Sequence, residues 1–298
     1  MRSPTPRFRC SGSRGVPRRL GAAFVLGSLL AVAALGASLP LPGVFSAGLG
    51  PAAREHLPKD RLYPVPFAPG ETLVYEVAWL KIEGGEMTIA TTRERTPDGV
   101  PVHRISLTAE SNEYVSRFYP VRTRYETWVD ARDFLPIRFE KHAREGRYES
   151  DELEQFDLAR RVAVWRDEEH VRATGPVPER FQDIISSFFW LRTQALVPGS
   201  SVDVDMYSRG KVYRLRAVVL GRETAETPLG AFPAYKVQPQ LREGETDADR
   251  NRGKLFLWFS DDDRRLPVMA RTVLPIGSVT ARLKRVEPGG APLTARAD

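Results

Sequence analysis

Alternation of apolar and polar residues dominates the chain from residue 72 onward. Leu73, Tyr75 and Val77 occupy every second position of the first such segment, which is the period of a strand with one buried face. The same alternation returns in residues 104–110, 125–129, 202–206, 213–219 and 279–283. Glycine-rich turns separate several of these segments. Short strands at such close spacing predict an antiparallel meander, because parallel strands would need helical crossovers between them.

One segment has the helical period instead. Its apolar residues lie at positions i, i+3, i+4, i+7 and i+8, so a helix would gather them on one stripe. They are Phe181, Ile184, Ile185, Phe188 and Phe189. We expect a helix from Glu179 to Leu196, packed against the concave face of the sheet as a core element or as a gate over a lipophilic cavity. The predicted fold is therefore mainly β: an antiparallel curved sheet or incomplete β-barrel with one prominent apolar helix.

The N-terminus has the character of an export signal. Six arginines and no acidic residue occupy positions 1–19, and an uncharged apolar run follows from Leu20 to Leu39. Residues 1–39 are thus predicted to be a cleaved signal peptide or an N-terminal membrane anchor, with possible attachment through residues 20–39. We expect an exported protein that is periplasmic, or anchored to the inner membrane and facing the periplasm.

Composition divides the remaining chain into three parts. Residues 40–69 are rich in Pro, Gly and Ala and are predicted to be a linker. Residues 70–287 form the predicted β domain, and residues 288–298 a loose tail. Cys10, the only cysteine, precedes the apolar run, so disulfides and cysteine chemistry are not expected in the exported part.

Net charge gives no reason to expect a nucleic-acid partner. Six of the 44 Lys and Arg residues lie in the leader, which leaves 38 against 38 Asp and Glu. A domain with balanced charge has no general electrostatic attraction for phosphate backbones.

Several ordered blocks resemble the DUF3108 family of exported bacterial proteins. The resemblance runs from about residue 70 to residue 286 and begins with Gly70-Glu71-Thr72-Leu73-Val74-Tyr75-Glu76-Val77. Further blocks are Gln182–Arg192, Gly230–Val237, Leu257–Asp262, Leu266–Val268 and Ile276–Val279. The family is a domain of unknown function, so the resemblance implies export and a β-rich fold, and it supplies no catalytic residue.

No residue pattern in the chain specifies a metal, a cofactor or a catalytic site. Asp247 to Gly253 places oxygen ligands at alternate positions, but Trp258 stands where a calcium loop needs a bidentate Glu. The acidic run Asp261–Asp263 is typical of a turn, and the four histidines are scattered. We therefore predict no catalytic residues, no metal and no cofactor.

Aromatic and other apolar residues are the side chains of this sequence that could form a binding site for an apolar ligand. The predicted ligand-binding residues are Phe181, Ile185, Phe188, Phe189, Trp190 and Trp258. The favoured hypothesis is non-enzymatic binding of a lipophilic envelope component, or of a partner envelope protein, in the concave face. Two alternatives stay open: a structural or assembly factor that recruits another β protein through a sheet edge, and a hydrolase with an unrecognised site.

Overall fold

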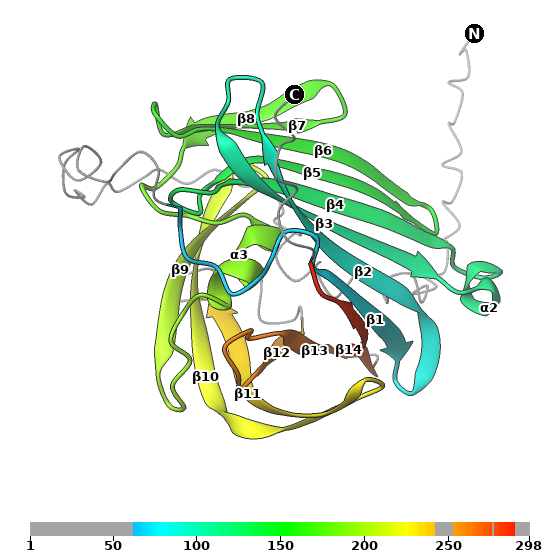
Figure 1. The fold of residues 1–298 in the computed structure, drawn as a ribbon. Helices are drawn as coiled ribbons and strands as arrows, with labels where there is room; N and C mark the ends of the chain where they lie inside the picture. Colours follow the sequence, from blue (N-terminus) through cyan, green and yellow to red (C-terminus); the bar gives the residue numbers. More distant parts are fainter. Residues whose placement is uncertain (1–61, 242–252, 276, 290–298) are drawn as a thin grey trace, which may run out of the picture.

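A computed structural model describes residues 62–241, 253–275 and 277–289. The predicted leader, residues 40–61 of the linker, most of the calcium-like loop and residues 290–298 of the tail lie outside the described residues. The described chain forms one curved antiparallel sheet with a short helix inside its curve (Figure 1).

Fourteen strands make up this sheet. They are β1 (Thr72–Trp79), β2 (Ile82–Arg95), β3 (Pro101–Ser111), β4 (Val121–Asp130), β5 (Pro136–Glu145), β6 (Tyr148–Asp157), β7 (Val162–Asp167), β8 (His170–Pro176), β9 (Ser201–Ser208), β10 (Lys211–Thr227), β11 (Gly230–Leu241), β12 (Lys254–Ser260), β13 (Pro267–Leu274) and β14 (Gly277–Glu287).

Two meanders joined in the middle produce the strand order. The sheet runs β8-β7-β6-β5-β4-β3-β2-β1-β14-β13-β12-β11-β10-β9, so the first and last strands are neighbours at its centre. Because β8 and β9 are its two edges and do not pair with each other, the sheet is not closed into a barrel. The prediction of a mainly β, antiparallel, incomplete barrel is confirmed.

Alternation along the strands produces the core. The register places Leu107 opposite Tyr125 and Ile105 opposite Thr127, and these side chains are buried. Large apolar side chains on the same face of β1 and β14, such as Tyr75 and Leu283, continue this layer. One face of the meander therefore forms the interior of the curve, as the period of two predicts.

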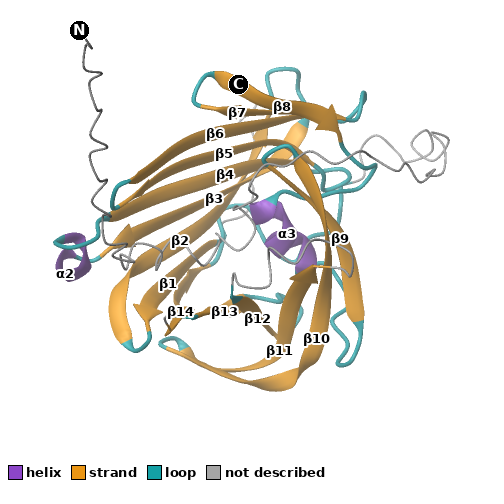
Figure 2. Ribbon diagram, turned by 180° about the vertical axis from the view of Figure 1, so that it is seen from behind, coloured by secondary structure: helices purple, strands orange, loops and turns teal. Residues whose placement is uncertain are grey.

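The helix predicted for this interior is present but much shorter than expected. α3 spans Ile184–Leu191, only eight residues, instead of Glu179 to Leu196. The prediction of a prominent helix was therefore wrong in extent. The other helix of the described chain, α2, spans Glu113–Ser116 and has four residues (Figure 2).

Backbone pairing explains where α3 begins. The Gln182 N–H donates to the Asp205 carbonyl, and the Gln182 carbonyl accepts from the Tyr207 N–H, which keeps this residue extended alongside β9. Asp183 then caps the helix: its carboxylate accepts from the Ile185 and Ser186 N–H groups. The apolar stripe thus continues upstream of the helix, but Phe181 reaches the core from extended chain.

Residues 62–69 pack against the sheet. The Tyr63 N–H donates to the Ala131 carbonyl, and the buried Phe67 ring meets the Phe189 ring edge to face at 5.2 Å.

No helix in the described part of the chain is long and apolar enough to cross a membrane.

Candidate functional site

α3 and the residue Phe181 ahead of it carry five of the six predicted binding residues. Phe181, Ile185 and Phe189 are each only 2 % exposed and belong to the core. Phe188 and Trp190 remain half-buried and pack against two hydrophobic clusters, one that contains Phe189 and one that contains Leu191. These two side chains are therefore the predicted residues on the helix that solvent or a ligand can reach.

The sheet opposite α3 carries half-buried apolar side chains as well. Leu255 of β12 and Ala270 of β13 pack against the cluster formed by Leu191, Leu257 and their neighbours. Because side chains alternate along a strand, Leu255 shares the helix-facing side of β12 with Leu257. Half-buried apolar groups thus lie on the helix and on the sheet that faces it.

Trp258 is placed apart from this surface. It alternates with Leu257 along β12, so its indole points to the opposite face of the sheet, where Nε1 donates to Glu223 at 2.8 Å. The Lys236 ammonium lies 5.1 Å from the centre of its ring. The structure brings the five predicted residues on and next to α3 together. Trp258, 3 % exposed, belongs to the same buried cluster as Phe181, Ile185 and Phe189, but it extends from the face of β12 opposite to Leu257.

A buried ion pair fixes the C-terminal end of α3. Arg192, 0 % exposed, donates to the Glu71 carboxylate at 2.7 Å and to the Arg264 carbonyl at 3.0 Å. Its guanidinium also lies 5.2 Å from the ring centres of Phe67 and Phe189. These contacts bind the helix end to the start of β1, and sequence reasoning assigned them no role.

A buried carboxyl group fixes the other end of α3. Asp183 is fully buried and accepts a hydrogen bond from the Thr127 hydroxyl of β4 in addition to its capping bonds. Burial raises the pKa of Asp183 to about 6, although these hydrogen bonds favour the ionised form. Burial likewise raises the pKa of the neighbouring Glu154.

Asp183→Asn should flatten the dependence of stability on pH. Because the pKa of Asp183 is higher in the folded protein, its protonated form stabilises the fold. This contribution is fully present below pH 3.8 and is lost as pH rises through about 6. This loss amounts to about 3 kcal/mol, and asparagine, which stays neutral, still caps the helix. Urea unfolding of both proteins between pH 4 and pH 8 checks this. Parallel pH profiles would contradict the expected role of Asp183.

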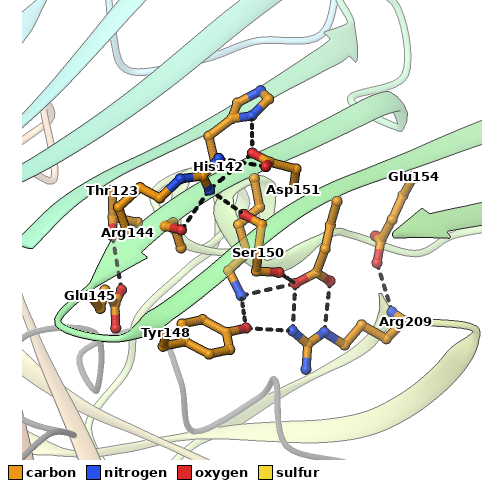
Figure 3. Close-up of polar contacts among 12 residues, drawn as sticks. Thr123, His142, Arg144, Glu145, Tyr148, Ser150, Asp151, Glu154 and Arg209 are labelled. Carbon is orange, nitrogen blue, oxygen red and sulfur yellow. Dashed lines mark hydrogen bonds and ion pairs between the residues drawn. The ribbon is translucent and has the colours of Figure 1, made fainter. Parts of the chain in front are cut away.

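A second polar cluster joins the β9–β10 turn to β5 and β6 near the other end of the strand order (Figure 3). Arg209, in the turn between β9 and β10, donates through Nε to Glu152 of β6 at 2.7 Å and through its backbone N–H to Glu154 at 2.7 Å. The Lys141 ammonium of β5 donates to Glu152 at 2.9 Å and to the Tyr148 hydroxyl at 3.1 Å. Side chains thereby connect β9 and β10 to β6 where no strand pairing does.

Comparison with known proteins gives the family of this chain. The profile described as "Protein of unknown function (DUF3108)" matches residues 74–284, which is most of the chain. The protein belongs to the DUF3108 family. A search of the curated proteins finds no significant match.

Solved structures resemble this DUF3108 domain in fold. A β-barrel-like protein of the domain of unknown function DUF1849 from Brucella abortus has a TM-score of 0.50 and 9 % identity, with 76 % of this chain and 100 % of that chain covered. The hypothetical protein CT021 from Chlamydia trachomatis has a TM-score of 0.35 and 9 % identity, covering 78 % and 93 %. A protein from Bacteroides fragilis, described as a candidate exported protein with a YmcC-like fold, has a TM-score of 0.29 and 11 % identity, covering 76 % and 100 %. The first of these likenesses supports the β-barrel-like architecture.

The polar cluster around Glu152 has the chemistry of a structural contact rather than that of a catalytic site. The Ser150 hydroxyl donates to Glu152 at 2.7 Å. A serine hydroxyl beside a carboxylate is an arrangement that a nucleophile and its general base could have. Burial alone would raise the pKa of Glu152, but hydrogen bonds from Arg209 and the charge of Lys141 hold it at about 2. So weak a base does not take the proton of a serine hydroxyl at neutral pH.

Other acidic and histidine side chains pair locally. His142 and Arg144 contact Asp151 on the outer face of the sheet, and Asp262 accepts from the Arg264 and Arg265 N–H groups within its own turn. Within the described ranges, no three His, Cys, Asp or Glu side chains gather into a group that could hold a metal ion.

Proposed function

We propose that this DUF3108 protein is an exported, non-enzymatic binding protein that holds a lipophilic envelope molecule between α3 and β12–β13. The observation that carries the proposal is the half-buried apolar surface of Phe188 and Trp190 on the helix and Leu255 and Ala270 on the sheet. Apolar side chains that keep partial exposure inside a curved sheet suit a ligand with an apolar body.

Export to the periplasmic side of the inner membrane is part of this proposal. The arginine-rich start and the apolar run at residues 20–39 support it. The absence of cysteine after Cys10 means that the exported chain does not depend on disulfide formation.

A second candidate function is recruitment of another β protein through the β8 edge. In the described part of the chain, β8 pairs only with β7 and its residues are largely exposed. A free edge can accept an added strand from a partner. β8 ends in Gly175 and Pro176, however, which limits the length over which a partner could pair.

Phe188→Asp should abolish retention of a small molecule by the protein purified from its own envelope. A carboxylate on this surface would need to be desolvated against an apolar ligand, which is strongly unfavourable. Native mass spectrometry of the gently purified exported form measures the retained mass and the N-terminus together.

Phe256→Asp is the matched control for this experiment. Phe256 is half-buried like Phe188, but it belongs to β12 and lies on the strand face opposite to Leu255 and Leu257, beside Lys236. The control variant should keep the ligand. A wild-type protein with a ligand-free mass would refute the proposed function, and a co-purifying protein subunit would support edge recruitment instead.

A further inference from the structure

One end of the sheet displays a group of exposed apolar side chains, which we call the apolar rim. It consists of Leu80 and Ile82 at the β1–β2 turn and of Tyr114 and Phe118 in the β3–β4 connection that contains α2. These are four of the eleven exposed large apolar side chains in the described part of the chain. Figures 1 and 2 both show α2 and the β1–β2 turn at the same end of the sheet.

Hydrogen bonds hold the two parts of the apolar rim together. The Asn112 N–H donates to the Gly84 carbonyl at 2.9 Å, and the Asn112 side-chain amide donates to the Glu83 carbonyl at 2.9 Å. On the other side, the Leu80 N–H donates to the Ser278 carbonyl at 2.7 Å. The turns are therefore fixed in place relative to one another.

The aromatic pair of the apolar rim is held outward. Asn112 also caps α2 by accepting from the Val115 N–H at 2.9 Å, which fixes the short helix. Tyr114 and Phe118 then meet edge to face with ring centres 5.8 Å apart, yet they remain 64 % and 76 % exposed. A fixed conformation that leaves two rings in water is the arrangement expected of a contact surface.

Size and charge distinguish among the surfaces that could cover the apolar rim. The two rings present roughly 300 Å² between them, and even with Leu80 and Ile82 the rim stays below the roughly 800 Å² per partner of a specific protein interface. Lys81 and Arg147 lie at the tips of the β1–β2 and β5–β6 turns without an ion pair to any described residue. Of the acidic residues beside these turns, Glu113 is paired with Arg117 and Glu149 with Arg144. The Gly146 N–H donates to the Pro120 carbonyl, and this hydrogen bond joins the β5–β6 turn to the β3–β4 connection that contains α2.

We propose that the apolar rim inserts into the surface of a bilayer that contains anionic lipids. Tyrosine and phenylalanine at turn tips suit the headgroup region, aliphatic neighbours add apolar contact, and the adjacent cations attract anionic headgroups. Docking by a few projecting side chains needs no large flat interface. This inference stands apart from the ligand of the concave face and depends only on the apolar rim.

A fluorescent label at the apolar rim tests the inference. Phe118→Cys, in a Cys10→Ser background, is labelled with an environment-sensitive fluorophore, and vesicles of phosphatidylglycerol and phosphatidylethanolamine are added to the full exported protein. The fluorescence should rise several-fold. The same label at Leu220→Cys, an exposed apolar position on β10, should not respond. Comparing two sites in one protein removes any contribution from membrane attachment through residues 20–39.

The result overturns the inference if position 118 stays unchanged or if both positions respond equally. A rise without vesicles that grows with protein concentration would also overturn it, in favour of self-association. In the labelled protein, Lys81→Glu with Arg147→Glu should reduce the response several-fold, and an undiminished response would refute the role of anionic lipid. Loss of the retained molecule in native mass spectra would leave this response unaffected, so the two proposals fail separately.

Discussion

Replacing Arg192 with methionine should lower the free energy of unfolding by about 3–5 kcal/mol, because removing one partner of a buried ion pair leaves the other charge uncompensated. Glu71 is only 3 % exposed, and its nearest cation, at 2.7 Å, is Arg192. Arg264, which lies 3.5 Å from Glu71, is half-exposed and compensates weakly. Urea unfolding at pH 7 measures the loss.

Two further variants separate the ion pair from general packing. Replacing both Arg192 and Glu71 with methionine should cost less than the sum of the two single replacements, because no buried charge is then left alone. Arg216→Met, which removes the half-exposed pair with Asp203, should cost at most about 1 kcal/mol. A loss below about 1 kcal/mol for Arg192→Met would contradict the assigned role of the buried pair.

Glu152→Gln should destabilise the fold by a similar amount at pH 7 and by much less in acid. Glu152 accepts from Lys141, Arg209 and Ser150, and its loss leaves the Lys141 ammonium, 6 % exposed, without its carboxylate. The pKa of Glu152 is lowered from 4.5 to about 2, which corresponds to about 3 kcal/mol. A lowered carboxyl pKa stabilises the fold above pH 4.5, and this contribution is lost as pH falls through about 2.

Unfolding at several pH values tests this linkage. The difference in unfolding free energy between the wild type and Glu152→Gln should be largest at pH 7 and should shrink between pH 4.5 and pH 2. Glu149→Gln, an exposed position on the same strand, is the matched control and should change stability little. A difference that stays constant with pH would show that ionisation of Glu152 does not stabilise the connection between β6 and the β9–β10 turn.

Apolar alternation made the sheet predictable from the sequence, since each strand in a meander has one buried face and pairs with its sequence neighbour. Helix length was not predictable in the same way. Phe181 fits the helical stripe as well as Phe189 does, but Gln182 uses its backbone groups to pair beside β9. That competing partner comes from a strand about 25 residues away and leaves no mark in the local pattern.

The polar cluster was missed because β6 has no clear apolar face. Ser150, Glu152 and Glu154 lie on the inner side, and the outer side carries Leu153 among acidic and polar residues, so periodicity could not tell which set is buried. Phe156, at the same parity as Glu154, was a signal for the buried side, but Leu153 indicated the opposite side. Among the predicted binding residues, Trp258 shows the same difficulty: β12 is apolar on both faces, and only the register assigns the indole to the outer face.

The pairing of β1 with β14 joins the first and the last strand of the domain, so it can form only after the whole domain has been synthesised. Each meander, β1 to β8 and β9 to β14, contains mainly contacts between neighbours in sequence, whereas the register from Thr72 opposite Glu287 to Trp79 opposite Val279 spans the whole domain. A chain that emerges N-terminus first can therefore assemble the first half early, but β1 keeps an unpaired edge until the final strand arrives. A chain that lacked β14 would expose the β1 edge, which is a template for aggregation, so the last strand of the domain is expected to protect the first one.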